Sequence, residues 1–278
     1  MHNIMKKIFT SASLFSSLLA LVLMSVACKG NKGQTTSVST PVAETKDIVS
    51  TNLDSLHITN MPDSILHIEY DFQYLKSDGT ITDSINASIA QALVSGKRTT
   101  DVRQAILDAM LEEESAMQAE IQEFYEPEDE TYGHLEYNIV RTGRFHFDAP
   151  DTVVAYKATI DMYTGGAHGS YTTLTLNFSR NTGHLISPED VFDMTHEADI
   201  LNLMLAQLLK DNKCQTREEL MEKTSLLTLG DLYLTTNFHL GKDAVTFCFG
   251  QYDIAPYACG ITHIRLGYDC LSPYLKNK

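Results

Sequence analysis

The sequence predicts an α+β fold, in which helices pack on an antiparallel sheet of hairpins and the chain forms two intimate subdomains. Segments with alternating apolar and polar residues follow one another in pairs joined by short turns, which is typical of β-hairpins. Helical segments fall in two separate blocks and do not alternate one by one with the strands. This order favours α+β over a βαβ arrangement.

The central hairpin is predicted over residues 153–179. In its second strand, Leu174, Leu176 and Phe178 alternate with polar residues at 173, 175, 177 and 179. Successive strand side chains point to opposite faces, so we expect one buried face and one face in water. The glycine-rich corner 164–169 separates the two strands, and its backbone should take angles that oppose a side chain.

Turn and cap signals follow the hairpin. Residues 180–183, Arg-Asn-Thr-Gly, predict a tight turn. Ser187 is a predicted N-cap, with Pro188 at the first helical position and acidic residues after it. A helix predicted over 196–209 is apolar around most of its circumference, so it should be well buried. The remaining predictions are a capping box at 216–219, a hairpin over 234–249, a strand over 261–266 and a helical turn over 269–275.

The part before the hairpin combines strands and helices. We predict strands at 65–74 and 135–147, with a possible bulge at 141–143, and helices at 83–94 and 101–125. Asp101 and Gln104 form a plausible capping box for the second helix. Its acidic run, residues 112–114, is expected to be a solvated face and not a metal or acid cluster.

The N-terminus has the features of a targeting segment. Two lysines precede an apolar run that ends in Ser25-Val26-Ala27-Cys28. These small residues before a cysteine resemble a bacterial lipobox, with Ser25 where leucine is commoner. We expect lipidation at Cys28; the alternative is an ordinary secretory signal or a single membrane anchor. The implied location is the cell envelope, with the domain extracytoplasmic (periplasmic) and lipid-anchored to a bacterial membrane.

Four regions are therefore predicted along the chain. They are a lipoprotein signal peptide over 1–27, a flexible tether over 28–61, an N-terminal α/β subdomain over 62–132 and a C-terminal α+β domain over 133–278. The tether is rich in Gly, Ser, Thr, Asn, Lys and Pro and should hold the domain near the membrane without pressing it against the surface.

The chain is acidic. Its formal charge is −15, and loss of Lys6 and Lys7 with the signal would make it −17. This charge argues against nucleic acid or anionic lipid as a partner of the domain and suits a basic protein. Cys214, Cys248, Cys259 and Cys270 show no CxxC spacing, which disfavours zinc binding. Both one disulfide near the C-terminus and free thiols remain open.

His168 stands in the glycine corner and allows three interpretations. It could act as a metal ligand or general base, it could satisfy the corner's own hydrogen bonds, or the corner could line a binding surface. No histidine, cysteine or carboxylate stands at ligand spacing from it. We therefore expect no metal, no cofactor and no catalytic residue.

Two segments resemble a bacterial family. The first is Tyr163-Thr-Gly-Gly-Ala-His-Gly169, followed by Leu176-Asn-Phe178 and the Thr182-Gly183 turn; the second is residues 249–260, FGQYDIAPYACG. Together they resemble the extracytoplasmic domain of RsiV-like proteins and the accessory domain of PdaC-like deacetylases. Much of this family consists of domains of unknown function. The resemblance covers roughly residues 60–278 and carries no catalytic residue.

What the resemblance implies is a non-catalytic binding or sensing domain for a protein or a cell-wall glycan. The candidate binding residues are Tyr163, Gly165, Gly166, His168, Gly169, Tyr252, Asp253, Pro256 and Tyr257. Three alternatives stay open. One is a protein that binds or inhibits lysozyme, a basic enzyme. The second is a cell-wall hydrolase that uses His168 with Asp161 or Asp253. The third is a structural lipoprotein whose loops serve folding alone.

Overall fold

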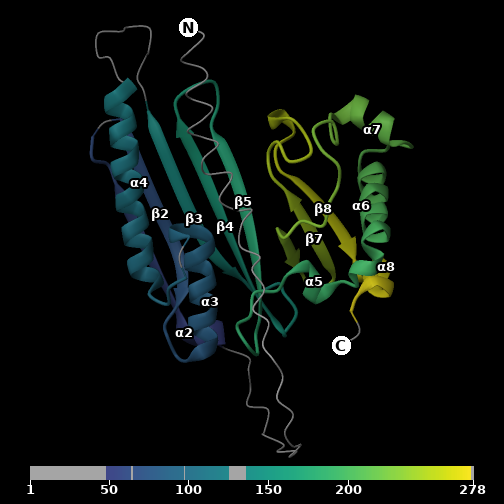
Figure 1. The fold of residues 1–278 in the computed structure, drawn as a ribbon, viewed down its shortest axis with the longest axis horizontal. Coiled ribbons are helices and arrows are strands. Elements are labelled where there is room, and N and C mark those ends of the chain that lie inside the picture. Colours follow the sequence, from purple (N-terminus) through teal and green to yellow (C-terminus); the bar gives the residue numbers. More distant parts are fainter. Residues whose placement is uncertain (1–47, 64, 97, 125–135, 277–278) are drawn as a thin grey trace, which may run out of the picture. The chain divides into compact units, whose positions relative to one another are not determined.

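A five-stranded sheet forms one half of the fold (Figure 1). The computed structural model describes residues 48–63, 65–96, 98–124 and 136–276. The sheet follows chain order, and its strands are β1 (Leu53–Asn60), β2 (Leu66–Leu75), β3 (Tyr137–His146), β4 (Val153–Thr164) and β5 (Ser170–Ser179). Four of these strands were predicted. The α+β class with an antiparallel hairpin at its centre is confirmed.

One strand pair departs from the antiparallel prediction. Strands β2 and β3 run parallel, with Leu66 opposite Tyr137 and Phe72 opposite Gly143. Parallel neighbours need a crossover, and the chain between them forms helices α3 (Thr80–Ala90) and α4 (Val102–Phe124), joined by a π-helical turn at Gln91–Ser95. Both helices lie on the same face of the sheet (Figure 1).

The first strand was missed. Residues 48–60 fall in the predicted tether, but they form a short helix, α2 (Ile48–Asn52), and the edge strand β1. β1 pairs along its whole length with β2, from Leu53 opposite Leu75 to Asn60 opposite Ile68. The segment 53–60, LDSLHITN, has only three apolar residues, which suffices for an edge strand with one solvated face. The predicted signal peptide, Cys28 and residues 28–47 of the tether lie outside the described residues.

The helix-covered face of the sheet forms the first core. Its largest buried side chains include Tyr70, Phe72, Tyr156 and Phe178. The buried stripe predicted on α4 packs against them, with Val102, Ile106 and Met110 each at most 4% exposed. Asp101 accepts a hydrogen bond from the backbone N–H of Gln104 at 3.0 Å, so half of the predicted capping box forms. The Gln104 side chain turns instead to Asp108.

The acidic run on α4 is not a purely solvated face. The Glu113 carboxylate pairs with the Arg141 guanidinium and accepts a hydrogen bond from the Tyr70 hydroxyl at 2.6 Å. Both charged side chains are nearly buried, at 11% and 13% exposure. The prediction for residue 113 is wrong because β3 brings an arginine onto the helix-covered face, and a buried charge needs such a partner.

The possible bulge at 141–143 does not form. The β3–β4 register is unbroken from Tyr137 opposite Thr164 to His146 opposite Ala155. Gly143 serves packing instead, because a Cβ at this position would lie 2.1 Å from the hydroxyl oxygen of Tyr156. That hydroxyl donates to the carbonyl oxygen of Gln73 at 2.9 Å.

The second half of the fold is a three-stranded sheet with its own helices. The strands β6 (Phe238–Leu240), β7 (Ala244–Phe249) and β8 (Thr262–Gly267) pair antiparallel in chain order. The helices are α5 (Pro188–Val191), α6 (Glu197–Asp211), α7 (Arg217–Thr224) and α8 (Tyr268–Leu271). α6 packs on β8 and closes a second core of phenylalanines and leucines (Figure 1). Only Ile200, Met204 and Leu208 of α6 are fully buried, so the predicted deep burial holds for one face.

The predicted caps are present. Ser187 and Asp190 form a full capping box at α5, and the Thr216 hydroxyl accepts from the backbone N–H of Glu219 at 3.2 Å. The turn before α5 has Gly183 at φ 69°, as its sequence requires. The four described cysteines are free thiols. No helix among the described residues has both the length and the apolar character needed to cross a bilayer.

The two sheets are joined by asparagine side chains. The Asn177 amide donates to the carbonyl oxygen of Phe238 at 2.6 Å and accepts from the N–H of Leu240 at 3.0 Å. In return, the Asn237 amide donates to the carbonyl oxygen of Thr173 at 2.7 Å and accepts from the N–H of Thr175 at 2.9 Å. Each side chain thus pairs with the other strand's backbone as a peptide group would. We call this pair the asparagine joint.

The burial of β5 and the pairing of β2 with β3 correct two predictions. The polar face of β5 is not solvated, because Thr173, Thr175 and Asn177 are 4%, 7% and 1% exposed beneath the second sheet. The predicted boundary at 132/133 also does not separate the two halves, since β2 and β3 lie side by side in one sheet. The two cores divide the chain later, with the second core drawing most of its members from residue 186 onwards.

Candidate functional site

The tip of the β4–β5 hairpin is a fixed corner. Gly165 and Gly166 have φ of 83° and 87°, angles that an L side chain opposes. Gly169 is needed for space, because a Cβ there would lie 2.8 Å from the carbonyl oxygen of Met162. The Tyr163 hydroxyl donates to the carbonyl oxygen of Gly166 at 3.2 Å. The predicted strained corner is therefore confirmed.

The second segment is a tight loop after β7. Its first turn is closed by Asp253, whose carboxylate accepts from the backbone N–H of Gly250 at 2.7 Å. Ile254 and Ala255 are buried and anchor the loop in the second core. Pro256 precedes a short 3₁₀ turn, Tyr257–Cys259. Tyr252 lies in the turn that Asp253 closes. Its φ of 68° is in the left-handed region that a bulky residue rarely enters.

The two segments meet, although about 80 residues separate them in the chain. The His168 ring stacks on the Tyr257 ring with centroids 3.8 Å apart and planes 19° apart. The Tyr252 ring lies 6.1 Å from that of Tyr257. The Gln251 side chain accepts from the backbone N–H of Tyr171 at 3.1 Å. We call this region the aromatic surface, and it consists of His168, Tyr171, Tyr252 and Tyr257.

A third segment borders the aromatic surface. The N–H of Leu229 donates to the carbonyl oxygen of Ile254 at 3.4 Å, and Gly230 packs so closely on the Asp253 carbonyl that a Cβ would lie 2.7 Å from it. Tyr233 packs edge-on against Phe249 at 5.2 Å. Burial, followed by the negative charge of Asp253, raises the pKa of the Tyr233 hydroxyl.

Exposed apolar side chains gather in this region. The large apolar side chains with more than a third of their surface in water include Tyr171 at 41%, Leu229 at 54%, Tyr233 at 44% and Tyr252 at 56%. A cluster of such groups marks an interaction site more often than scattered ones do. Sequence reasoning missed Tyr171, Leu229 and Tyr233, because only folding brings their segments beside the 250–257 loop.

The charges beside the aromatic surface are negative. Asp253 follows Tyr252 in the loop, and Asp161 stands opposite Tyr171 in the β4–β5 register. The segments 158–173 and 250–262 contain neither lysine nor arginine. The chain's acidic balance is therefore maintained at this surface.

The geometry does not assemble the histidine–carboxylate pair of the hydrolase alternative. The His168 Nδ1 lies 3.0 Å from the carbonyl oxygen of Gly169, and the ring face is covered by Tyr257. Asp253 is occupied by the turn that it closes. Among the described residues, no group of three or more His, Cys, Asp or Glu side chains is arranged to hold a metal ion.

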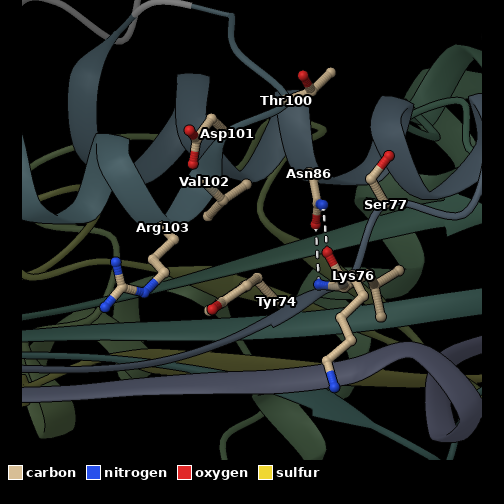
Figure 2. Close-up of a pocket in the computed structure, with 9 residues that line it drawn as sticks. Tyr74, Lys76, Ser77, Asn86, Thr100, Asp101, Val102 and Arg103 are labelled. Carbon is tan, nitrogen blue, oxygen red and sulfur yellow. Dashed lines mark hydrogen bonds between the residues drawn. The ribbon is translucent and has the colours of Figure 1, made fainter.

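A separate cavity of about 290 Å³ opens at the start of α4 (Figure 2). Its lining includes Tyr74, Lys76 and Arg103, and its buried polar group is Asn86. The Asn86 amide donates to the carbonyl oxygen of Leu75 at 2.6 Å and accepts from its N–H at 3.0 Å, as Figure 2 shows. This amide ties α3 to the end of β2, so its hydrogen-bonding capacity serves the fold.

Part of the chain is similar to a family of proteins of unknown function. Residues 189–269 match a family model described as a protein of unknown function, DUF3298. This match runs from the second residue of α5 to the middle of α8 and includes the 250–260 loop. No curated protein matches the chain.

Two solved structures of DUF3298 proteins resemble this chain over most of its length. One, from Bacteroides fragilis, has 25% sequence identity and a TM-score of 0.73, over 81% of this chain and 93% of that one. The other, from Pseudomonas aeruginosa, has 15% identity and a TM-score of 0.54, over 81% of this chain and 94% of that one, and this likeness shows the fold alone. The chain is thus similar to DUF3298 proteins. The resemblance to RsiV-like and PdaC-like domains is compatible with these matches and stays a prediction.

Proposed function

We propose that this chain is a non-catalytic binding protein of the bacterial cell envelope, which recognises a protein or cell-wall ligand through its aromatic surface. The observation that carries the proposal is the meeting of the two family-like segments, 163–169 and 250–257, at one exposed cluster of rings. Segments that served folding alone would be expected to bury their aromatic side chains, but Tyr252 remains 56% exposed.

The surface has the properties of a preformed recognition site. Tyrosine is enriched at binding hot spots because it offers a large rigid area at low entropic cost. Hydrogen bonds at Gly166, Gly250 and Tyr171 fix the backbone on which these rings stand. Left-handed backbone at Tyr252 costs about 1–2 kcal/mol, and strain of this kind clusters at functional sites.

The partner class that fits best is a basic protein, of which lysozyme is the candidate to test. The segments that build the surface carry carboxylates and neither lysine nor arginine, and the chain as a whole has a net charge of −15. Opposite charge speeds encounter and suppresses wrong partners. A neutral cell-wall glycan is the second partner class, because exposed tyrosine rings offer it a flat apolar face.

The location is part of the proposal. We propose that a lipid on Cys28 holds the protein at a bacterial membrane, with the binding domain outside the cytoplasm. The support is the lipobox-like sequence Ser25-Val26-Ala27-Cys28 after an apolar run. A Cys28→Ser change should move the protein from the membrane fraction to the soluble fraction. Equal membrane retention of the wild type and the Cys28→Ser variant would contradict lipid anchoring.

Calorimetric titration of the purified protein tests the binding proposal. The ligands are lysozyme, lysozyme with acetylated lysines, and soluble peptidoglycan fragments. We expect saturable lysozyme binding that weakens with salt and with acetylation. The double change Tyr252→Ala with Leu229→Ala should weaken binding at least about tenfold, as loss of hot-spot side chains does.

The matched control removes exposed apolar side chains elsewhere. Met61 and Leu111 are 65% and 61% exposed, and the change Met61→Ala with Leu111→Ala should leave binding unchanged. If only peptidoglycan fragments bind, and the Tyr252/Leu229 variant loses that binding, the partner is a cell-wall glycan and not a basic protein. The assignment of the binding surface would then still hold. The proposal fails if no ligand binds, or if both double variants lose the same affinity.

A further inference from the structure

A polar groove of about 200 Å³ lies between the two sheets. Its lining includes His146, Lys157, Thr175, His239, Cys248 and His263, and we call it the inter-sheet groove. These side chains come from strands β3 to β8, one from each. The groove shares no lining residue with the aromatic surface, so it is a second and independent feature.

The strand period explains why the groove is polar. On β7, Phe247 and Phe249 point into the second core, so Cys248 between them faces the other way. On β4, Tyr156 belongs to the first core, and its neighbour Lys157 faces the groove. Each sheet therefore turns its apolar face to its own helices and its polar face to the other sheet.

Basic groups outnumber acidic ones in this groove. Lys157 forms no ion pair with any other described residue. It still acts on its surroundings: burial, and after it the Lys157 charge, lowers the pKa of His263. The pKa of His146 is lowered chiefly by burial and also by His239 and Lys157, against an opposing effect of Asp148. Asp148 is the acid of the groove, and its carboxylate lies 3.1 Å from Nε2 of His239.

Two threonines of β5 line the groove and offer hydroxyl groups to it. Thr173 and Thr175 are 4% and 7% exposed, and their backbone groups are held by Asn237. Their hydroxyls form no hydrogen bond with another described side chain or backbone group. Because these hydroxyls line the groove, they are available to donate to a ligand oxygen inside it.

The groove is not arranged as a thiol active site. Cys248 stands opposite His263 in the β7–β8 register, which brings a thiol and an imidazole together. Burial raises the pKa of the Cys248 thiol to about 11, against an opposing effect of Lys157. The thiol is therefore protonated at neutral pH and is a poor nucleophile.

We propose that the inter-sheet groove binds a small oxyanion, such as a carboxylate or sulfate group, with the Lys157 ammonium as its counter-ion and the hydroxyls of Thr173 and Thr175 as donors. Its volume is below that of typical drug-sized ligand sites, so the ligand has only a few heavy atoms. Charge-assisted hydrogen bonds to a partly desolvated oxyanion are among the stronger polar contacts in proteins.

Affinity should rise as the pH falls. The titratable groups that face the groove are His146 from β3 with Asp148 after it, Lys157 from β4, His239 from β6, Cys248 from β7 and His263 from β8. Strand β5 contributes threonines. Arg265 stands on the same face of β8 as His263, opposite Thr246. The pKa values of His146 and His263 lie below the ordinary value, so these two imidazoles gain protons only as the pH falls below that value, and each added positive charge favours the anion. The Asp148 carboxylate beside His239 works against the anion.

The test uses the purified protein in a buffer without other oxyanions, with sulfate and malonate as separate probes and chloride as the ionic-strength control. Proton NMR follows the histidine rings during each titration. We expect saturable shifts of His146, His239 and His263, with smaller shifts of His57 and His184, which are exposed outside the groove. Affinity should be higher at about pH 5.5 than at about pH 7.5.

Two lysine variants complete the design. Lys157→Met should weaken sulfate binding about tenfold, as expected for the loss of one charged hydrogen-bond donor. Lys210→Met, on the exposed part of α6, should leave it unchanged. The proposal is overturned if neither probe gives saturable shifts in the wild type, if all histidines shift alike, or if the two variants bind equally. The wild-type titration decides the question even where Lys157→Met does not fold.

Discussion

Two contacts connect the five-stranded sheet to the second half of the fold, and they differ in burial and in chemistry. The asparagine joint is built from amides, with Asn177 only 1% exposed and both of its amide atoms hydrogen-bonded. The contact at the hairpin tip is built from rings, with His168 exposed and stacked on Tyr257. Both contacts join segments that lie far apart in the chain, so long range alone does not explain the difference.

The difference separates a structural contact from a recognition surface. A buried amide that replaces backbone pairing satisfies groups that water cannot reach, so its loss leaves donors and acceptors unpaired. Exposed stacked rings lose little when they are parted, because water and a ligand can both reach them. We therefore expect changes at the joint to act on stability and changes at the tip to act on binding.

The largest effect is expected for Asn177→Ala. This change leaves the carbonyl of Phe238 and the N–H of Leu240 without their partner inside the fold. The free energy of unfolding should fall by about 2–4 kcal/mol, since each unsatisfied buried group costs about 1–3 kcal/mol. Urea unfolding measures it. Asn181→Ala, in the exposed turn after β5, is the matched control and should change stability by less than about 0.5 kcal/mol. Equal losses in both variants would show that the joint is not a structural contact.

A smaller and opposite effect is expected for Tyr252→Gly. Glycine accepts φ 68° without steric cost, so unfolding should require up to about 1 kcal/mol more free energy, while ligand affinity falls. A variant that is more stable and binds less would separate the two roles directly. Urea unfolding and lysozyme titration of the same preparation give both numbers. Loss of stability in this variant would mean that the Tyr252 ring holds the loop in place.

His168→Ala should change the free energy of unfolding less than Asn177→Ala or Tyr252→Gly does. An exposed aromatic stack contributes about 0.5–1.5 kcal/mol at most, and solvent reduces the net value. We expect a loss below about 1 kcal/mol in urea unfolding together with a clear loss of binding. His184→Ala removes another exposed imidazole, outside the aromatic surface, and should leave binding unchanged. A large loss of stability with intact binding would show that the tip of the β4–β5 hairpin serves folding and not binding.

The local features of this fold could be predicted from sequence. The alternation over 172–179, the caps at Ser187 and Thr216 and the glycine corner are short-range patterns, and the structure contains them. The candidate binding residues also included both partners of the ring stack, because each stood in a recognisable segment. Sequence reasoning placed the two segments on one surface but had no means to predict the stack itself.

The errors came from partners that lie far away in the chain. Glu113 looked solvated because nothing near it in sequence announces Arg141 on β3. The polar face of β5 looked exposed because its cover, β6, begins about 60 residues later. Residues 53–60 looked like tether because an edge strand needs few apolar side chains. In the first two cases a tertiary contact decided the environment of residues whose secondary structure was predicted correctly, whereas over 53–60 the strand itself was missed.

The smallest predicted effect concerns pH and returns to the space beside the joint. Burial and the Lys157 charge lower the pKa of His263, and burial with His239 and Lys157 lowers that of His146. Between the unfolded value of about 6.5 and the lower folded value, the unfolded state binds more protons, so stability falls as the pH drops through this window. Lys157→Met removes one cause of the shift and should flatten this fall. Urea unfolding from about pH 7.5 to about pH 5, without oxyanions, measures the slope for the wild type, Lys157→Met and Lys210→Met. A slope that is the same in all three would show that the Lys157 charge does not reach the histidines. A flatter slope in Lys157→Met alone would establish the electrostatic coupling on which anion binding in the groove depends.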